Sequence, residues 1–310
     1  IEQIEYEGFV TKEQLIVNDA ARRKFTKMPK GTKWGAKWEY AWFRAEIVIP
    51  KSAAGKRVVL KTDRCPGEAA VYINRKHAGS SDHQHKELLL STKAVPGTMY
   101  EVMLEIYAGH GPWVCGGGPC PHGVKTIPEP PPSQIEVGVC SYGIWEEELY
   151  QLWIDMDTLY QLWKGIVDKD SLRIAQIEQG LKEITLVLDL ELPREKMMKT
   201  VTKARNVLAP LLKAVNGSSA PFMHCFGHSH IDVAWLWPLR ETEAKCTRTF
   251  ATQLDLIKQY PEFKFLQSQC HLYWMVKTKY PELYEEIKKA VKKGNWMPEG
   301  GMWVESDTNL

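Results

Sequence analysis

The segment that decides the fold is residues 227–238, which read GHSHIDVAWLWP. In an extended backbone alternate side chains point to the same side, so His228, His230 and Asp232 are predicted to share one face. Neutral imidazole nitrogens and carboxylate oxygens are common zinc ligands, and a catalytic zinc usually takes about three of them from the protein. The spacing therefore favours a metal half-site, although two histidines hydrogen-bonded at the end of a strand would give the same pattern.

The sequence on either side of this segment alternates between strand and helix patterns. Strand-like runs at 221–226, 263–267 and 296–298 alternate with apolar residues at helical spacing over 241–260 and 272–293. Such alternation predicts a parallel sheet, and parallel sheets bind ligands outside the carboxyl ends of their strands. The segment at 227–238 follows the first expected strand and is therefore the expected place for a site.

Residues 227–238 resemble the signature of glycoside hydrolase family 38, the retaining α-mannosidases, in the form typical of cytosolic and bacterial members. The resemblance continues through Glu241-Thr242, Lys245, Arg248, Phe250, residues 265–269 (FLQSQ), Trp274, Lys277, Tyr280-Pro281 and residues 300–310 (GGMWVESDTNL).

This resemblance implies a Zn²⁺ cofactor and an α-mannoside substrate. Carried over by position, His230 and Asp232 are expected to bind the metal, and Trp235 to line the sugar site. His228 is interpreted as a residue that orients a ligand through its ring N–H. The fold implied is a seven-stranded β/α barrel, of which this chain holds the first strands and helices.

The family's nucleophile lies in a Trp-x-x-Asp-x-Phe-Gly segment that this sequence does not contain. No catalytic residue is therefore assigned here. The nucleophile and the acid are expected beyond Leu310, and the chain by itself is expected to be an inactive amino-terminal part of an α-mannosidase.

The whole chain reads as multidomain. We expect a β-sandwich over residues 1–110, a Gly/Pro-rich connector over 111–145, a helical region over 146–217 and the start of the barrel over 218–310. Aromatic residues of the sandwich fit a core better than a sugar-binding surface; they are Trp34, Trp38, Trp42, Phe43 and Tyr72. Within the helical region, 174–188 also alternates like a strand, and helix is favoured there.

Composition bounds the other properties. The formal charge of +2 is too small a basic excess to favour nucleic acid as a partner. No stretch of sequence is long and apolar enough to span a membrane. Seven cysteines, an odd number, suit reduced thiols and a cytoplasmic location. Composition does not decide whether the full-length chain forms a homo-oligomer. Three residues of the connector, Cys115, Cys120 and His122, are too few for a structural zinc site, which needs about four protein ligands.

Two other functions stay open on the residues alone. A metal-dependent deacetylase or amidohydrolase would also use His and Asp, and a non-catalytic carbohydrate-binding protein would use the aromatics. Several other polar residues are expected to be structural or on the surface rather than in a site: Gln267, Ser268, Gln269, Glu305, Asp307, His83 and His85.

Overall fold

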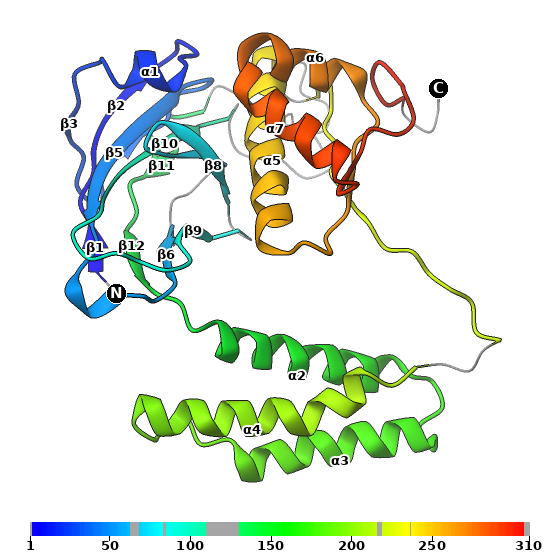
Figure 1. Cartoon of the computed structure of the whole chain (residues 1–310). Coiled ribbons are helices and arrows are strands. Elements are labelled where there is room, and N and C mark those ends of the chain that lie inside the picture. Colours follow the sequence, from blue (N-terminus) through cyan, green and yellow to red (C-terminus); the bar gives the residue numbers. More distant parts are fainter. Residues whose placement is uncertain are drawn as a thin grey trace. The chain divides into compact units, whose positions relative to one another are not determined.

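The computed structural model describes residues 2–62, 68–82, 85–109, 130–215, 219–235 and 237–306. The chain forms two compact units, one made of residues 1–144 and 224–310 and the other of residues 145–223. Figure 1 shows the elements of each unit along the chain. Some residues considered above lie outside the described ranges: Cys115, Cys120, His122, His83 and Asp307.

The first part of unit 1 is an antiparallel β-sandwich. Its larger sheet has the strand order β3-β2-β5-β10-β7-β8, its smaller sheet has the order β1-β12-β6-β9, and β11 pairs with β4. The strands are β1 Glu2–Ile4, β2 Glu7–Thr11, β3 Thr26–Lys27, β4 Lys33–Trp34, β5 Tyr40–Val48, β6 Val58–Lys61, β7 Ala69–Ile73, β8 Lys76–Ser81, β9 Glu87–Ser91, β10 Met99–Tyr107, β11 Ile135–Glu136 and β12 Cys140–Ile144.

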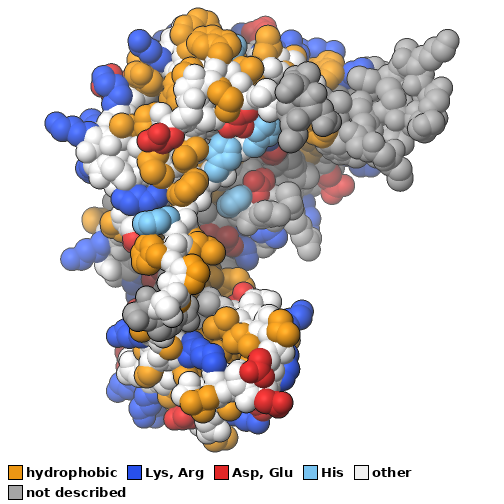
Figure 2. All heavy atoms as spheres, turned by 90° about the vertical axis from the view of Figure 1, so that its right-hand side faces the viewer, with side chains coloured by type: hydrophobic (Ala, Val, Ile, Leu, Met, Phe, Trp, Pro, Cys, Tyr) orange, Lys and Arg blue, Asp and Glu red, His pale blue; other side chains and the backbone are white. Residues whose placement is uncertain are grey.

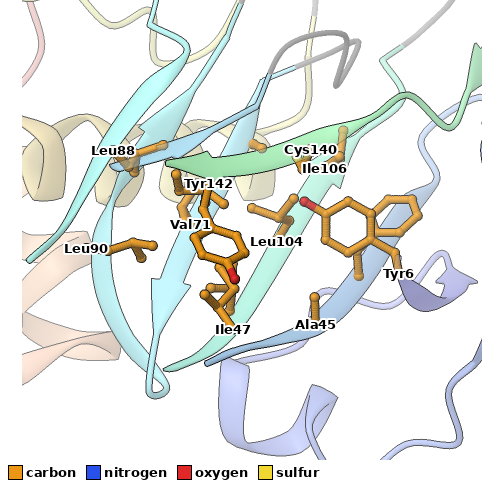
Figure 3. Close-up of a cluster of buried hydrophobic side chains, with 14 of the residues drawn as sticks. Tyr6, Ala45, Ile47, Val71, Leu88, Leu90, Leu104, Ile106, Cys140 and Tyr142 are labelled. Carbon is orange, nitrogen blue, oxygen red and sulfur yellow. The ribbon is translucent and has the colours of Figure 1, made fainter. Parts of the chain in front are cut away.

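The apolar interior of the sandwich lies between these two sheets. Figure 3 shows Ala45 and Ile47 of the larger sheet in one cluster with Leu88 and Tyr142 of the smaller sheet. Trp42 points to the opposite face of β5, where residues of helix α1 (Val17–Ala20) cover it. This alternation along β5 buries apolar side chains on both faces and confirms the predicted sandwich.

The sandwich continues beyond the residues where we expected it to end. Strands β11 and β12 fall inside the connector predicted over 111–145, and β12 lies between β1 and β6 in the smaller sheet. Cys140 and Tyr142 alternate inward from β12 and are buried. The strand is only five residues long and contains Gly143. Its alternation of apolar and polar residues was therefore too short to predict a strand directly after a Gly- and Pro-rich segment.

The second part of unit 1 is a small parallel sheet with helices. Strands β13 (Gly227–His228), β14 (Phe265–Leu266) and β15 (Trp296–Met297) are neighbours in that order, and all pair in parallel. Helices α5 (Leu239–Gln259), α6 (Cys270–Lys279) and α7 (Pro281–Lys292) connect them. The parallel sheet is therefore confirmed, and the described residues form three strands without closing a barrel.

The first of these strands does not lie where the sequence placed it. The apolar residues Phe222 and Met223 are largely exposed, and the strand comprises only Gly227 and His228. A Cβ on Gly227 would lie 2.8 Å from the ring of Phe263, so any other residue at the start of this strand would have to displace that ring. The prediction of a strand over 221–226 was wrong, because hydrophobicity alone did not reveal which residues pair.

Helix α5 joins the small parallel sheet to the sandwich, and the two lie side by side in Figure 1. The Tyr40 hydroxyl donates to the Glu241 carboxylate at 2.9 Å, and Arg248 lies 2.9 Å from the same carboxylate and also contacts Glu68. Lys245 donates to both Glu68 oxygens at 2.6 Å. We call these five residues the α5 charge network; it holds α5 against strands of the larger sheet.

Unit 2 is a three-helix assembly. Helices α2 (Glu147–Gly165), α3 (Leu172–Val187) and α4 (Arg194–Leu212) bury residues at helical spacing, among them Leu159 and Ile177. The preference for helix over strand near residues 174–188 is confirmed, because α3 ends at Val187. Over the ranges that the structure describes, none of the helices combines the length and apolar character of a membrane span.

Candidate metal and sugar site

The candidate site lies at the carboxyl end of the three parallel strands. The segment after β13 carries His230 and Asp232, the segment after β14 carries Gln267 to Gln269, and the segment after β15 reaches Glu305. Because the strands are parallel, these segments meet at one edge of the sheet. Figure 2 shows histidine side chains gathered on one face of unit 1, next to acidic and hydrophobic side chains.

His230 lies between two carboxylates. Its Nε2 is 3.1 Å from Oδ1 of Asp232, and its Nδ1 contacts Oε2 of Glu305. The hydrogen bond to Glu305, with the charge of Asp232 beside it, raises the pKa of His230 above its usual value. The two predicted ligands are thus adjacent, as the alternation of residues 228–232 indicated.

Glu305 forms a cluster with His228, His230 and Asp232. Its side chain is the least exposed of the four, at 14%. Ser268 donates to its Oε1 at 2.5 Å, and Nε2 of His228 is 3.4 Å from the same oxygen. Burial raises the pKa of Glu305, but the hydrogen bond from Ser268 and the two histidines outweigh burial and leave the pKa below its usual value. Glu305 is therefore held as an acceptor at the centre of the cluster.

His228 lies at the same edge but does not hydrogen-bond directly to His230 or Asp232. Its Nδ1 is 3.0 Å from the carbonyl oxygen of Leu266 on the neighbouring strand. Its other nitrogen faces Glu305, which in turn contacts His230. The link from His228 to His230 thus runs through a carboxylate that the sequence interpretation had treated as structural.

Two buried glutamines hold the backbone beneath the site. The Gln267 side chain donates to the carbonyl of Ser229 at 2.9 Å and accepts from the backbone N–H groups of Ser268 and Gln269. Gln269 donates to the carbonyl of Ile231 at 2.9 Å. Both amides therefore fix the loop at 229–232 that follows β13, which fits the expectation that they are structural.

The first turn of α5 holds the same loop from the other side. The Thr242 hydroxyl donates to the backbone carbonyl of Asp232 at 3.0 Å and accepts from the indole N–H of Trp237 at 2.9 Å. Trp235 packs edge-on against Trp237, with ring centroids 5.6 Å apart, and leaves about half of its surface exposed. An exposed ring next to His230 and Asp232 in sequence provides an apolar face of the kind that holds sugars.

The donor set suits a zinc ion as a half-site. One imidazole nitrogen and one carboxylate oxygen converge to 3.1 Å, and these are the ligand types that zinc prefers. Within the described ranges, no three His, Cys, Asp or Glu side chains are arranged to hold a metal ion. His230 and Asp232 would therefore supply two ligands, and further ligands would have to come from elsewhere.

Two family models match this chain, one over a range that includes the sandwich and one over the region of the small parallel sheet. Residues 3–162 match the α-mannosidase jelly roll domain, and residues 221–310 match the N-terminal domain of glycosyl hydrolases family 38. A jelly roll followed by this domain defines a class of glycoside hydrolases. The chain belongs to the family 38 α-mannosidases, as the resemblance of residues 227–238 indicated.

Curated relatives align with almost the whole chain. Human α-mannosidase 2C1 is 30% identical over 308 residues, which cover 98% of this chain and 28% of the relative. α-Mannosidase G of Dictyostelium discoideum is 29% identical over 304 residues, covering 96% and 27%. The chain thus spans little more than a quarter of the length of these relatives.

Among solved structures, a β-glucuronidase of Ruminococcus gnavus covers 34% of this chain and 20% of its own, with 17% identity and a TM-score of 0.28. A similarity at this level carries no argument about function.

Proposed function

We propose that the chain is the amino-terminal part of a zinc-dependent, retaining α-mannosidase that hydrolyses terminal α-mannosides of oligosaccharides or glycans. The observation that carries the proposal is the convergence of His230 Nε2 and Asp232 Oδ1 at the end of β13, within the motif that matches family 38. The identity to curated α-mannosidases over almost the full chain supports the substrate class.

In the proposed site, His230 and Asp232 would hold the zinc, and Trp235 would pack against the sugar ring. Bound zinc would supply a charge that orients sugar hydroxyls and stabilises a developing oxocarbenium ion. The protein's own part is to keep the ligands in place: Thr242 fixes the carbonyl of Asp232, and Gln267 fixes that of Ser229. Hydrolysis with retention needs two further carboxyl groups, a nucleophile and an acid.

Those two groups belong, in our proposal, to a remainder of the catalytic domain that completes a seven-stranded β/α barrel. Residues 1–310 alone would then be inactive, since the sequence lacks the Trp-x-x-Asp-x-Phe-Gly segment expected to carry the nucleophile. A cytoplasmic location and a homo-oligomeric state stay predictions.

The test compares residues 1–310 with the complete gene product. We expect the complete product to release mannose from an aryl α-mannoside with retained configuration, to lose activity with a chelator and to recover it with Zn²⁺. The isolated chain should release none. His230→Ala and Asp232→Ala should abolish both turnover and bound zinc measured by elemental analysis, whereas Lys288→Ala, on the exposed side of α7, should preserve both.

Each alternative predicts a different result. Release of acetate or an amine without mannose would indicate a metal-dependent deacetylase or amidohydrolase. Sugar binding that survives the chelator, without turnover, would indicate a carbohydrate-binding protein. Turnover by residues 1–310 alone would contradict the proposal that they lack the nucleophile.

A further inference from the structure

We propose that Glu305 is a positioning residue for His230: it holds Nδ1–H of the imidazole and so directs Nε2 toward the metal. This inference rests on the proposed function, because it assumes that His230 binds zinc. It assigns a role to a residue that the sequence motif did not single out and that lies 75 positions from its partner.

The argument begins with the two edges of the His230 ring. Nδ1 contacts Oε2 of Glu305, whereas Nε2 lies 3.1 Å from Oδ1 of Asp232. An ionised carboxylate can only accept a hydrogen bond, so Nδ1 must be the donor toward Glu305. In the neutral ring the free lone pair is then on Nε2, next to the Asp232 oxygen that would share the ion.

Glu305 is itself held by contacts other than the one to His230, one at Oε1 and one at its backbone N–H. Ser268 donates to Oε1 at 2.5 Å, and the backbone N–H of Glu305 donates to the Gln269 side chain at 3.2 Å. Because Gln269 is buried and also donates to the carbonyl of Ile231, the position of Glu305 is tied to the backbone between His230 and Asp232. A carboxylate held in this way can orient the imidazole without moving when the ring does.

The same geometry argues that Glu305 is not itself a ligand. The two carboxylates lie against opposite edges of one imidazole ring, so an ion on Nε2 beside Asp232 lies on the far side of the ring from Glu305. Carboxylate–histidine–metal arrangements of this kind raise the basicity of the ligand, and losing the outer carboxylate typically costs about 10- to 100-fold in metal affinity.

The test measures zinc affinity by chelator competition in the complete gene product, with visible absorption of the Co²⁺-substituted protein as a second readout. Glu305→Ala should weaken zinc binding about 10- to 100-fold while leaving the positions of the Co²⁺ bands unchanged, because the ligand set is the same. Glu305→Gln should recover most of the affinity, since its amide oxygen still accepts from Nδ1–H. Glu299→Ala, an exposed acidic residue after the same strand, is the matched control and should bind like the wild type.

The outcomes separate this inference from the proposed function. If His230→Ala and Asp232→Ala bind zinc as tightly as the wild type, the metal site itself is wrong. If those two variants lose zinc but Glu305→Ala does not, only the positioning role fails. If Gln fails to recover the affinity and both Glu305 variants shift the Co²⁺ bands, Glu305 is a direct ligand and the inference is overturned.

Discussion

Replacing Arg248 by Met should destabilise unit 1 severely, although Arg248 lies outside the candidate site. The guanidinium is only 6% exposed and lies 2.9 Å from the Glu241 carboxylate, which is 2% exposed. Methionine fills a similar volume but removes the positive charge. Glu241 would then keep only the hydroxyl of Tyr40 as a hydrogen-bond donor within the α5 charge network.

The expected loss follows from burial. Removing one partner of a buried ion pair costs about 3–5 kcal/mol, because the other charge stays buried and unpaired. Most of this loss should come from Glu241, since Glu68 is 45% exposed and keeps Lys245 at 2.6 Å. For a unit of about 230 residues, each kcal/mol lowers the Tm by about 2–4 °C, so the transition of unit 1 should fall by about 10 °C.

Differential scanning calorimetry at neutral pH is the assay. The matched control is Arg22→Met, which removes an arginine that is 80% exposed and 3.5 Å from Asp19, and it should leave the transition unchanged. Adding Glu241→Gln to Arg248→Met should restore part of the lost stability, because the neutral amide needs no counter-ion. A Tm for Arg248→Met within about 2 °C of wild type would refute the reasoning, because it would mean the pair contributes less than about 1 kcal/mol.

Three further results are expected. Burial and the nearby carboxylate of Glu241 raise the pKa of Glu105 to about 8, so the folded protein keeps a proton that the unfolded chain releases above its own pKa of about 4.3. Stability should therefore fall by up to about 1.4 kcal/mol per pH unit between about pH 5 and pH 8, and Glu105→Gln should flatten this dependence in urea titrations. Ser171→Ala should cost unit 2 about 0.5 kcal/mol in urea unfolding followed by circular dichroism, because the lost cap bond to the N–H of Ile174 is long, at 3.4 Å. Gly300→Ala should lower zinc affinity in chelator competition, because the new Cβ would lie 2.8 Å from Cβ of Ser268 and the φ of +97° disfavours alanine.

The helices were the most predictable part of the fold. Each of α2, α3, α4 and α5 carries apolar residues three and four positions apart over more than four turns, and such long patterns identify helices well. Tyr280-Pro281 divided the last helical pattern into α6 and α7, because proline is favoured at the first position of a helix, where its missing N–H costs no hydrogen bond.

The short strands were less predictable. Strands β13, β14 and β15 have two residues each, so too few side chains alternate to identify them. Their positions depend on pairing between neighbours, as at Gly227 with Phe265, and pairing is not visible in one segment alone.

The candidate site was predictable where its residues are local. His228, His230 and Asp232 follow one another at a spacing of two, and the structure brings them to one edge of the sheet. Glu305 could not be found in this way, because its segment has no apolar period and it reaches His230 only through the order of the parallel strands. The signal that would have found it is the position of its segment after a third parallel strand.

The α5 charge network was missed for a related reason. Charged residues are rarely buried, and the sequence does not indicate that the face of α5 carrying Glu241 and Arg248 is covered. Only the packing of α5 against the sandwich shows that this face is covered, with Tyr40 and Glu68 supplying the matching groups.

That network also constrains how the polypeptide can fold during synthesis. Tyr40 meets Glu241 across 201 positions, and Glu68 meets Arg248 across 180. All of unit 2 is made between these partners, and its helices, which depend on nearby contacts, can assemble first. The sandwich must leave the ribosome and wait, with the strands that α5 will cover still open to water, until that helix emerges. Slowing translation across residues 145–223 should therefore prolong the time during which the nascent chain is exposed to aggregation.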